Sequence, residues 1–111
     1  MEVRNATAAD VDAFYGERPA QSMRAIAIVK DEKPLAIIGL AFEGDRFQAF
    51  SEYKPELEPH LKSMTVLRAI KQGQAMIAAA TLPVVAYSKG NPALLKRLGF
   101  VEVPGGYLWP F

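Results

Sequence analysis

The most constraining feature of this 111-residue chain is a short helix whose two ends are both encoded in the sequence. Asn91 is suited to cap the first free amides, and Pro92 stands at the first helical position, where its missing N–H costs nothing. Lys96 and Arg97 fall in the last turn, where positive charge suits the helix dipole. Gly99 supplies a left-handed stop. Because strand-like runs flank this segment, it predicts a strand–helix–strand unit.

Composition limits the classes of protein that the chain can belong to. Hydrophobic residues make up 50% of it, which is sufficient for the core of one domain over residues 1–111. With 13 basic and 12 acidic residues, the chain lacks the basic excess that a nucleic-acid partner requires, and we predict none. The absence of cysteine excludes disulfides and thiolate chemistry, and one histidine cannot build a zinc site, so no metal is expected. No apolar run has the length of a signal core or a membrane span, so a cytoplasmic protein without a membrane partner is expected.

The central part of the chain predicts three strands, at Met23–Lys30, Leu35–Phe42 and Arg46–Glu52. The turns between them are too short for crossovers, so the strands should form an antiparallel meander. The first two strands are apolar on both faces, which predicts a sheet covered on both sides. The aromatic residues here lack interleaved basic residues, which favours core packing over a base-stacking platform. These aromatic residues are Phe42, Phe47, Phe50 and Tyr53.

Two more helices are predicted. A capping box at Thr7–Asp10, after a short strand, opens a helix over about residues 8–15. After a loop over 53–59, a long helix should run roughly from His60 to Ala80, with Gly73 allowing close packing on the sheet. Its apolar stripe should consist of Leu61, Met64, Leu67, Ile70 and Ile77. Short strands at 84–87 and 100–103 and a closing hairpin with 107–111 complete the order.

This order of elements, with the capped helix ending in Leu98-Gly99-Phe100, resembles the acetyl-CoA-dependent N-acetyltransferase (GNAT) superfamily. The order matches over essentially the whole chain, whereas the match in residues is specific only for 91–100. The resemblance implies an α+β fold with a mixed central sheet flanked by helices on both faces, in one domain. A compact chain without the family's Gly-rich loop is similar to members encoded by phages.

The resemblance also implies where a cofactor would lie. In the family, acetyl-CoA lies between the fourth and fifth strands, and its pyrophosphate rests on amides at the start of the long helix. The corresponding loop here is 60–65, and no glycine occurs between Gly44 and Gly73. A degenerate acetyl-CoA site is therefore implied, and an ordinary helix start with solvated polar residues is the alternative. The implied cofactor-binding residues are Lys62, Ser63, Thr65 and Asn91.

The catalytic residues follow from the same resemblance. Glu52, at the end of the fourth strand, corresponds to the family's general base. The tyrosine that serves many members as general acid is replaced here by Leu95, and Tyr87 is the nearest substitute. Each also has a structural interpretation, Glu52 as a solvated strand end and Tyr87 as a rim aromatic. His60 is expected to be an exposed polar loop residue rather than a base.

Two functions stay open. The first is transfer of an acetyl group from acetyl-CoA to an amine of a small molecule or a protein, by direct attack on the thioester. The second is a structural or interaction module with the GNAT fold and no catalysis, which the weak cofactor loop favours. In the family, the acceptor is chosen by segments that correspond to 15–22 and 104–111. The apolar segment 107–111 leaves a homodimer open.

Overall fold

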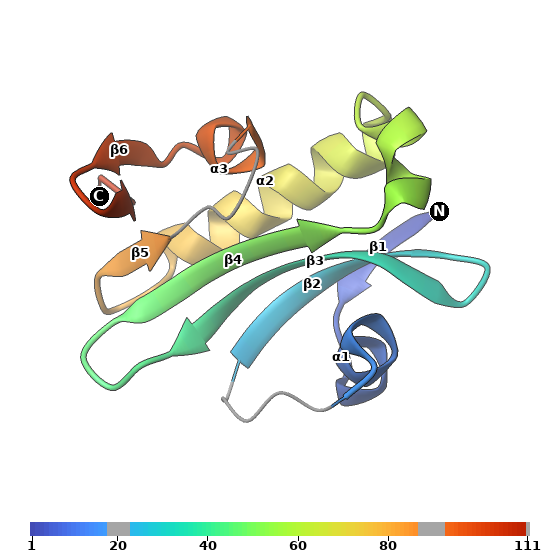
Figure 1. Ribbon diagram of the computed structural model, residues 1–111, viewed down its shortest axis with the longest axis horizontal. Coiled ribbons are helices and arrows are strands. Elements are labelled where there is room, and N and C mark those ends of the chain that lie inside the picture. The colour runs from blue at the N-terminus through green and yellow to red at the C-terminus, as the bar shows by residue number, and fades with distance from the viewer. Residues whose placement is uncertain (18–22, 87–92, 111) are drawn as a thin grey trace.

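The computed structural model describes residues 1–17, 23–86 and 93–110 (Figure 1). Within these residues the strands form one seven-stranded sheet in the order β1-β2-β3-β4-β5-β7-β6. The elements in chain order are β1 (Glu2–Asn5), α1 (Ala8–Tyr15), β2 (Met23–Lys30), β3 (Lys33–Phe42), β4 (Phe47–Tyr53), the 3₁₀ helix η1 (Pro55–His60), α2 (Met64–Ala78), β5 (Val84–Ala86), α3 (Ala93–Leu98), β6 (Val101–Val103) and β7 (Gly106–Leu108).

The sheet is mixed. β1 to β4 are antiparallel neighbours, which confirms the predicted meander. β4 and β5 are parallel, and β7 lies between β5 and β6, antiparallel to both. Parallel pairing of β4 with β5 requires a crossover, and η1 and α2 supply it.

Helices cover both faces of the sheet, as predicted from the doubly apolar strands. α1 packs against β3 on one face, and α2 with α3 lies on the other (Figure 1). The core between α2 and the sheet includes Ile38 of β3, Ile70 of α2 and Leu98 of α3. A smaller cluster under α1 joins Phe14 to Ala27 and Ile37.

The capping box of α1 is confirmed. Thr7 Oγ1 accepts from the Asp10 amide at 3.1 Å, and the Asp10 carboxylate accepts from the Thr7 amide at 3.0 Å. Arg4 of β1 also pairs with Asp10, at 2.7 Å between Nη2 and Oδ1. The hydrogen bond from Arg4 is the main reason why the pKa of Asp10 is lowered from its ordinary 3.8. These contacts fix the start of α1 to β1.

The prediction of one long helix from His60 was wrong at its start. Residues Pro55–His60 form a 3₁₀ helix, a short turn follows, and α2 begins only at Met64. Its first turn is set by Ser63, whose Oγ accepts from the Val66 amide at 3.3 Å.

The predicted apolar stripe was wrong in part as well, since Met64 is 65% exposed. Small residues let α2 approach the sheet: a Cβ on Gly73 would lie 3.1 Å from Cγ2 of Ile38, which confirms the predicted close packing. The buried face of α2 consists of Val66, Ala69, Ile70, Gly73 and Ile77.

Smaller corrections concern aromatic packing and strand ends. Phe42 is 49% and Tyr53 38% exposed, so core packing was wrong for these two side chains, whereas Phe47 and Phe50 are half-buried. β4 is displaced by one residue and reaches Tyr53. The predicted helix cap at Asn91 and Pro92 lies outside the described residues. No helix within the described residues is long and apolar enough to cross a membrane.

Candidate functional site

The edge of β4 that faces β5 is the first part of the candidate site. The Phe47 amide donates to the Pro83 carbonyl at 2.9 Å, and the last described pair of the parallel ladder joins Ala49 to Ala86. Because alternate residues of a strand direct their N–H groups to the same edge, the Ser51 amide faces this edge too. Among the described residues, the last part of β4 pairs with β3 on one edge and with no strand on the edge that faces β5, where it extends past β5 toward the start of α2 (Figure 1).

The start of α2 is the second part. The Ser63 side chain satisfies the Val66 amide, and the Ser63 carbonyl accepts from Leu67 at 3.1 Å. The amides of Met64 and Thr65 occupy first-turn positions, which have no carbonyl partner inside a helix. The helix dipole adds partial positive charge at these two donors. The start of α2 therefore presents backbone groups suited to an anion.

Cationic side chains border the start of α2. Lys62 is exposed immediately before the cap. Arg97, in the last turn of α3, donates from Nη1 to the Leu61 carbonyl at 3.3 Å. Gln74 of α2 donates to the Leu98 carbonyl at 3.0 Å and thereby fixes the end of α3. Arg97 was not predicted at this site, because its charge already suited the dipole of its own helix.

A pocket of about 300 Å³ opens on the α1 face of the sheet. Three of its side chains, Gln48, Phe50 and Glu52, alternate along β4 and so project from the same face of the strand. The end of α1 and the start of β2 provide other walls. The complete lining is Tyr15, Glu17, Met23, Ala41, Gln48, Phe50 and Glu52.

The pocket is acidic. Glu17 and Glu52 are exposed carboxylates, and no lysine or arginine is among the described residues that line it. Burial, with a contribution from the Glu52 carboxylate, raises the pKa of Tyr15 to about 12, so its phenol stays protonated at neutral pH. The Phe50 ring lies over Gly39, where an added Cβ would come within 2.5 Å of Cζ. Carboxylates beside an aromatic ring suit a cation.

The predicted site residues fall into two groups. Glu52 lines the acidic pocket, whereas Lys62, Ser63 and Thr65 lie at the start of α2. Tyr87 and Asn91 lie outside the described residues.

Gln48 was not predicted, and Glu17 was covered only by the predicted acceptor segment 15–22. Counting two and four residues back from Glu52 along its strand would have found Phe50 and Gln48. The prediction of His60 as an exposed loop residue was wrong: it ends η1 and is half-buried, and its carbonyl accepts from the Ser63 amide at 2.9 Å. Leu95, at the position of the family's tyrosine, is 5% exposed and belongs to the core, so it offers no proton donor.

Comparison with known proteins gives a fold. No protein-family model and no curated protein sequence matches the chain. Among solved structures, the ribosomal-protein-S18-alanine N-acetyltransferase from Escherichia coli is similar over 91% of this chain and 77% of its own, with 15% identity and a TM-score of 0.53. The crystal structure of the KacTA–DNA complex holds a chain that is similar over 96% of this chain and 89% of its own, with 14% identity and a TM-score of 0.56.

The chain has the GNAT fold. The predicted fold class is thereby confirmed. At 14–15% identity the likeness establishes the fold and leaves activity and ligands to be argued from this chain's own residues.

Proposed function

We propose that this protein is an N-acetyltransferase that transfers the acetyl group of acetyl-CoA to a cationic amine. The observation that carries the proposal is the position of two neighbouring residues on β4. The Ser51 amide faces the β5 edge, and the next side chain, Glu52, lines the acidic pocket. A thioester held along this edge would therefore lie beside a carboxylate that can receive a proton.

The start of α2 supports the cofactor assignment. A pyrophosphate there would meet the amides of Met64 and Thr65, with Lys62 and Arg97 as counter-charges. No glycine stands in this first turn, and Met64 is 65% exposed there. Ser63 uses its oxygen as a helix cap, while its hydroxyl hydrogen stays free to donate. We retain Asn91 as a further candidate contact.

The proposed reaction needs one base. Acetyl-CoA supplies the activated acetyl group. The ammonium of the acceptor gives a proton to Glu52, directly or through water, and the amine nitrogen then attacks the thioester carbonyl carbon. The C–N bond forms, the C–S bond breaks, and the nitrogen releases its second proton to solvent. The thiolate takes a proton from solvent or from Tyr87, which solvent then reprotonates. Tyr15, with its pKa of about 12, would donate a hydrogen bond and would not act as the base.

The acidic pocket supports an acceptor class. A pocket of about 300 Å³ is at the small end of ligand sites, so it would receive a small amine or the tip of a longer one. Two carboxylates and the Phe50 ring favour a positively charged group. A small-molecule amine and the ammonium of a protein chain share this chemistry.

Several predictions made from the sequence remain predictions. The KacTA structure contains DNA, but its 14% identity to this chain does not transfer that partner, and we keep the prediction of no nucleic-acid partner. A homodimer, a cytoplasmic location, a single domain over 1–111 and a phage source likewise stay predictions.

Thermal unfolding with and without acetyl-CoA tests the proposal. A ligand that binds only the folded state raises the free energy of unfolding by about 2.7 kcal/mol when its free concentration is 100 times its dissociation constant. Lys62→Ala should weaken the shift, whereas Lys71→Ala, an exposed lysine further along α2, should leave it unchanged. No shift at millimolar acetyl-CoA would exclude the enzyme.

A non-catalytic module is the second candidate. The glycine-free helix start and the buried Leu95 at the acid position favour it. Acetyl-CoA binding without any acetylated product, followed by mass spectrometry over a panel of diamines and basic peptides, would favour this module over the enzyme.

A further inference from the structure

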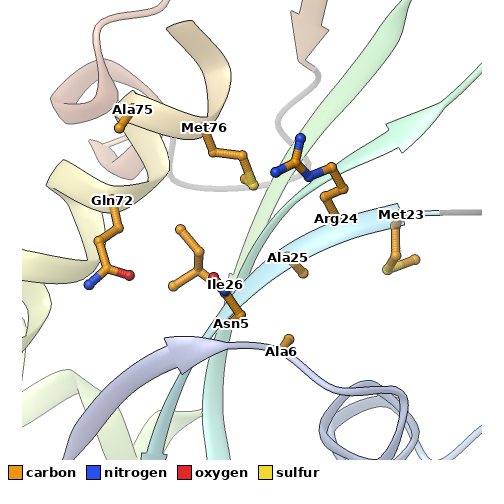
Figure 2. Close-up of a pocket in the computed structure, with 9 residues that line it drawn as sticks. All are labelled: Asn5, Ala6, Met23, Arg24, Ala25, Ile26, Gln72, Ala75 and Met76. Atoms are coloured by element: carbon orange, nitrogen blue, oxygen red, sulfur yellow. The ribbon is translucent and has the colours of Figure 1, made fainter. Parts of the chain in front are cut away.

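A second and larger cavity, of about 500 Å³, lies on the α2 face of the sheet (Figure 2). It lies between the second half of α2, the end of β1 and the start of β2. The start of α2, where a cofactor is proposed, lies elsewhere. It meets the acidic pocket only at Met23, the first residue of β2. Its lining residues are Asn5, Ala6, Met23, Arg24, Ala25, Ile26, Gln72, Ala75 and Met76.

The cavity exists because the first residues of β2 extend beyond the end of β1. β1 stops at Asn5, which pairs with Ile26, whereas β2 begins three residues earlier, at Met23. The Ala6 amide closes this step by donating to the Ala25 carbonyl at 2.9 Å. On α2 the facing residue Ala75 is too small to fill the space.

The walls combine positive charge with amide groups. Arg24 and Ile26 alternate with Ala25 along β2 and point toward α2 (Figure 2). Within the described residues, Arg24 has no carboxylate partner, and the cavity lining contains no aspartate or glutamate. The side-chain amides of Asn5 and Gln72 add donors from two other elements.

The floor of the cavity is apolar. Ile26 is buried, Met76 is half-buried, and Ala75 is a third apolar residue of the lining. A ligand that only neutralised Arg24 would leave the exposed part of Met76 in contact with water. A ligand that only covered the floor would leave the guanidinium without a partner. The cavity therefore fits a molecule that has both an anionic and a compact apolar part.

We infer that this cavity binds a small organic oxyanion, with its carboxylate or phosphate on Arg24 and its apolar part on Ile26 and Met76. A guanidinium offers paired N–H donors that match two oxygens of such a group. The Asn5 and Gln72 amides can donate to the same group. This site is separate from the acidic pocket and does not depend on acetyl transfer.

The test uses the full chain and benzoate as the probe, followed by ¹⁵N NMR. Benzoate should shift the backbone amide signals of Asn5, Arg24, Gln72 and Met76 saturably, with a dissociation constant at or below about 10 mM. Benzamide has the same shape without the charge and should cause at most a small shift. Inorganic phosphate should displace benzoate if the oxyanion is the recognised group, and a failure to displace it would assign recognition to the carboxylate with its ring.

Two variants test whether Arg24 is the group that binds benzoate. Arg24→Gln should weaken benzoate binding by about tenfold or more, while Lys71→Gln, an exposed cation of α2 outside the cavity, should not change it. The spectrum of each variant reports whether it is folded. Equal binding of benzoate and benzamide, unchanged binding by Arg24→Gln, or no saturable shift would overturn the inference.

Discussion

The acidic pocket and the Arg24 cavity lie on opposite faces of one sheet and carry opposite charge. The α1-face pocket has two carboxylates and no described cation, and the α2-face cavity has Arg24 and no carboxylate. The whole chain has a net charge of +1, which describes neither pocket. A balanced total charge therefore says little about the ligands that a small domain can hold.

The alternation of side chains along strands produces this separation. On β4, residues 48, 50 and 52 project toward α1, so Glu52 shares the face of Phe50. On β2, Arg24 shares the opposite face with Ile26. Moving either charge by one residue along its strand would place it on the other face. The difference in charge between the two pockets therefore depends on the register of β2 and β4 in the sheet.

The strongest test of the acidic pocket as the reacting one is Glu52→Gln. Glutamine keeps the shape of the side chain but cannot accept the proton of the ammonium, so turnover should fall by about 10²- to 10⁴-fold. Acetyl-CoA affinity should not change, since Glu52 lies on the acceptor side. Steady-state kinetics with a cationic amine and calorimetry with acetyl-CoA measure the two quantities.

The matched control for that variant is Glu56→Gln, an exposed carboxylate in η1 outside the pocket. It should retain full turnover. If the turnover of Glu52→Gln lies within a factor of two of the wild type, Glu52 is not the base. The acidic pocket would then differ from the Arg24 cavity in charge but would not supply the reacting carboxylate.

A smaller effect is expected at Asp10, which holds α1 and hence one wall of the acidic pocket. Asp10→Ala removes half of the capping box and leaves Arg4 without its close partner, which should cost about 2 kcal/mol at pH 7. Urea unfolding measures this loss. Asp45→Ala, in an exposed turn, is the control and should cost far less.

The pH dependence of the Asp10 effect has a defined sign. Because the folded-state pKa of Asp10 is lowered from 3.8, its stabilisation is present above that value and is lost as the pH falls through the folded pKa. The difference in unfolding free energy between wild type and variant should therefore shrink in acid. A difference that stays constant over the acid range would show that packing, and not the carboxylate, is responsible.

Sequence reasoning predicted the elements whose signals are local. The capping box at Thr7 and Asp10 and the short turns of the meander depend on neighbouring residues, and both appear as expected. The start of α2 was mispredicted because Pro59 is tolerated in a 3₁₀ helix and Ser63, taken as a cofactor contact, is the N-cap of α2. An N-cap and a phosphate contact use the same residue types, so the sequence could not separate them.

The site was predicted less completely than the fold. Glu52 was named as a candidate base from the resemblance to the GNAT superfamily, and that role stays a prediction. Arg24 was not predicted, and Tyr15 and Glu17 were covered only by the segment 15–22, because their pockets form only when α1, β2 and α2 pack together. Each of these side chains looks like an ordinary surface or helix residue in the sequence. Pockets made by tertiary packing leave no local pattern.

Glu17→Gln is expected to have the smallest effect. It tests whether the acidic pocket attracts its acceptor by charge. Glu17 is exposed at the pocket, so its attraction for a cationic acceptor should be worth about 0.5–1 kcal/mol, a two- to fivefold rise in KM with kcat unchanged. The rise should vanish near 1 M salt, where the screening length is about 3 Å, and it should be absent for a neutral acceptor. A rise that persists in high salt, or that appears equally for the neutral acceptor, would mean that Glu17 shapes the pocket instead of charging it.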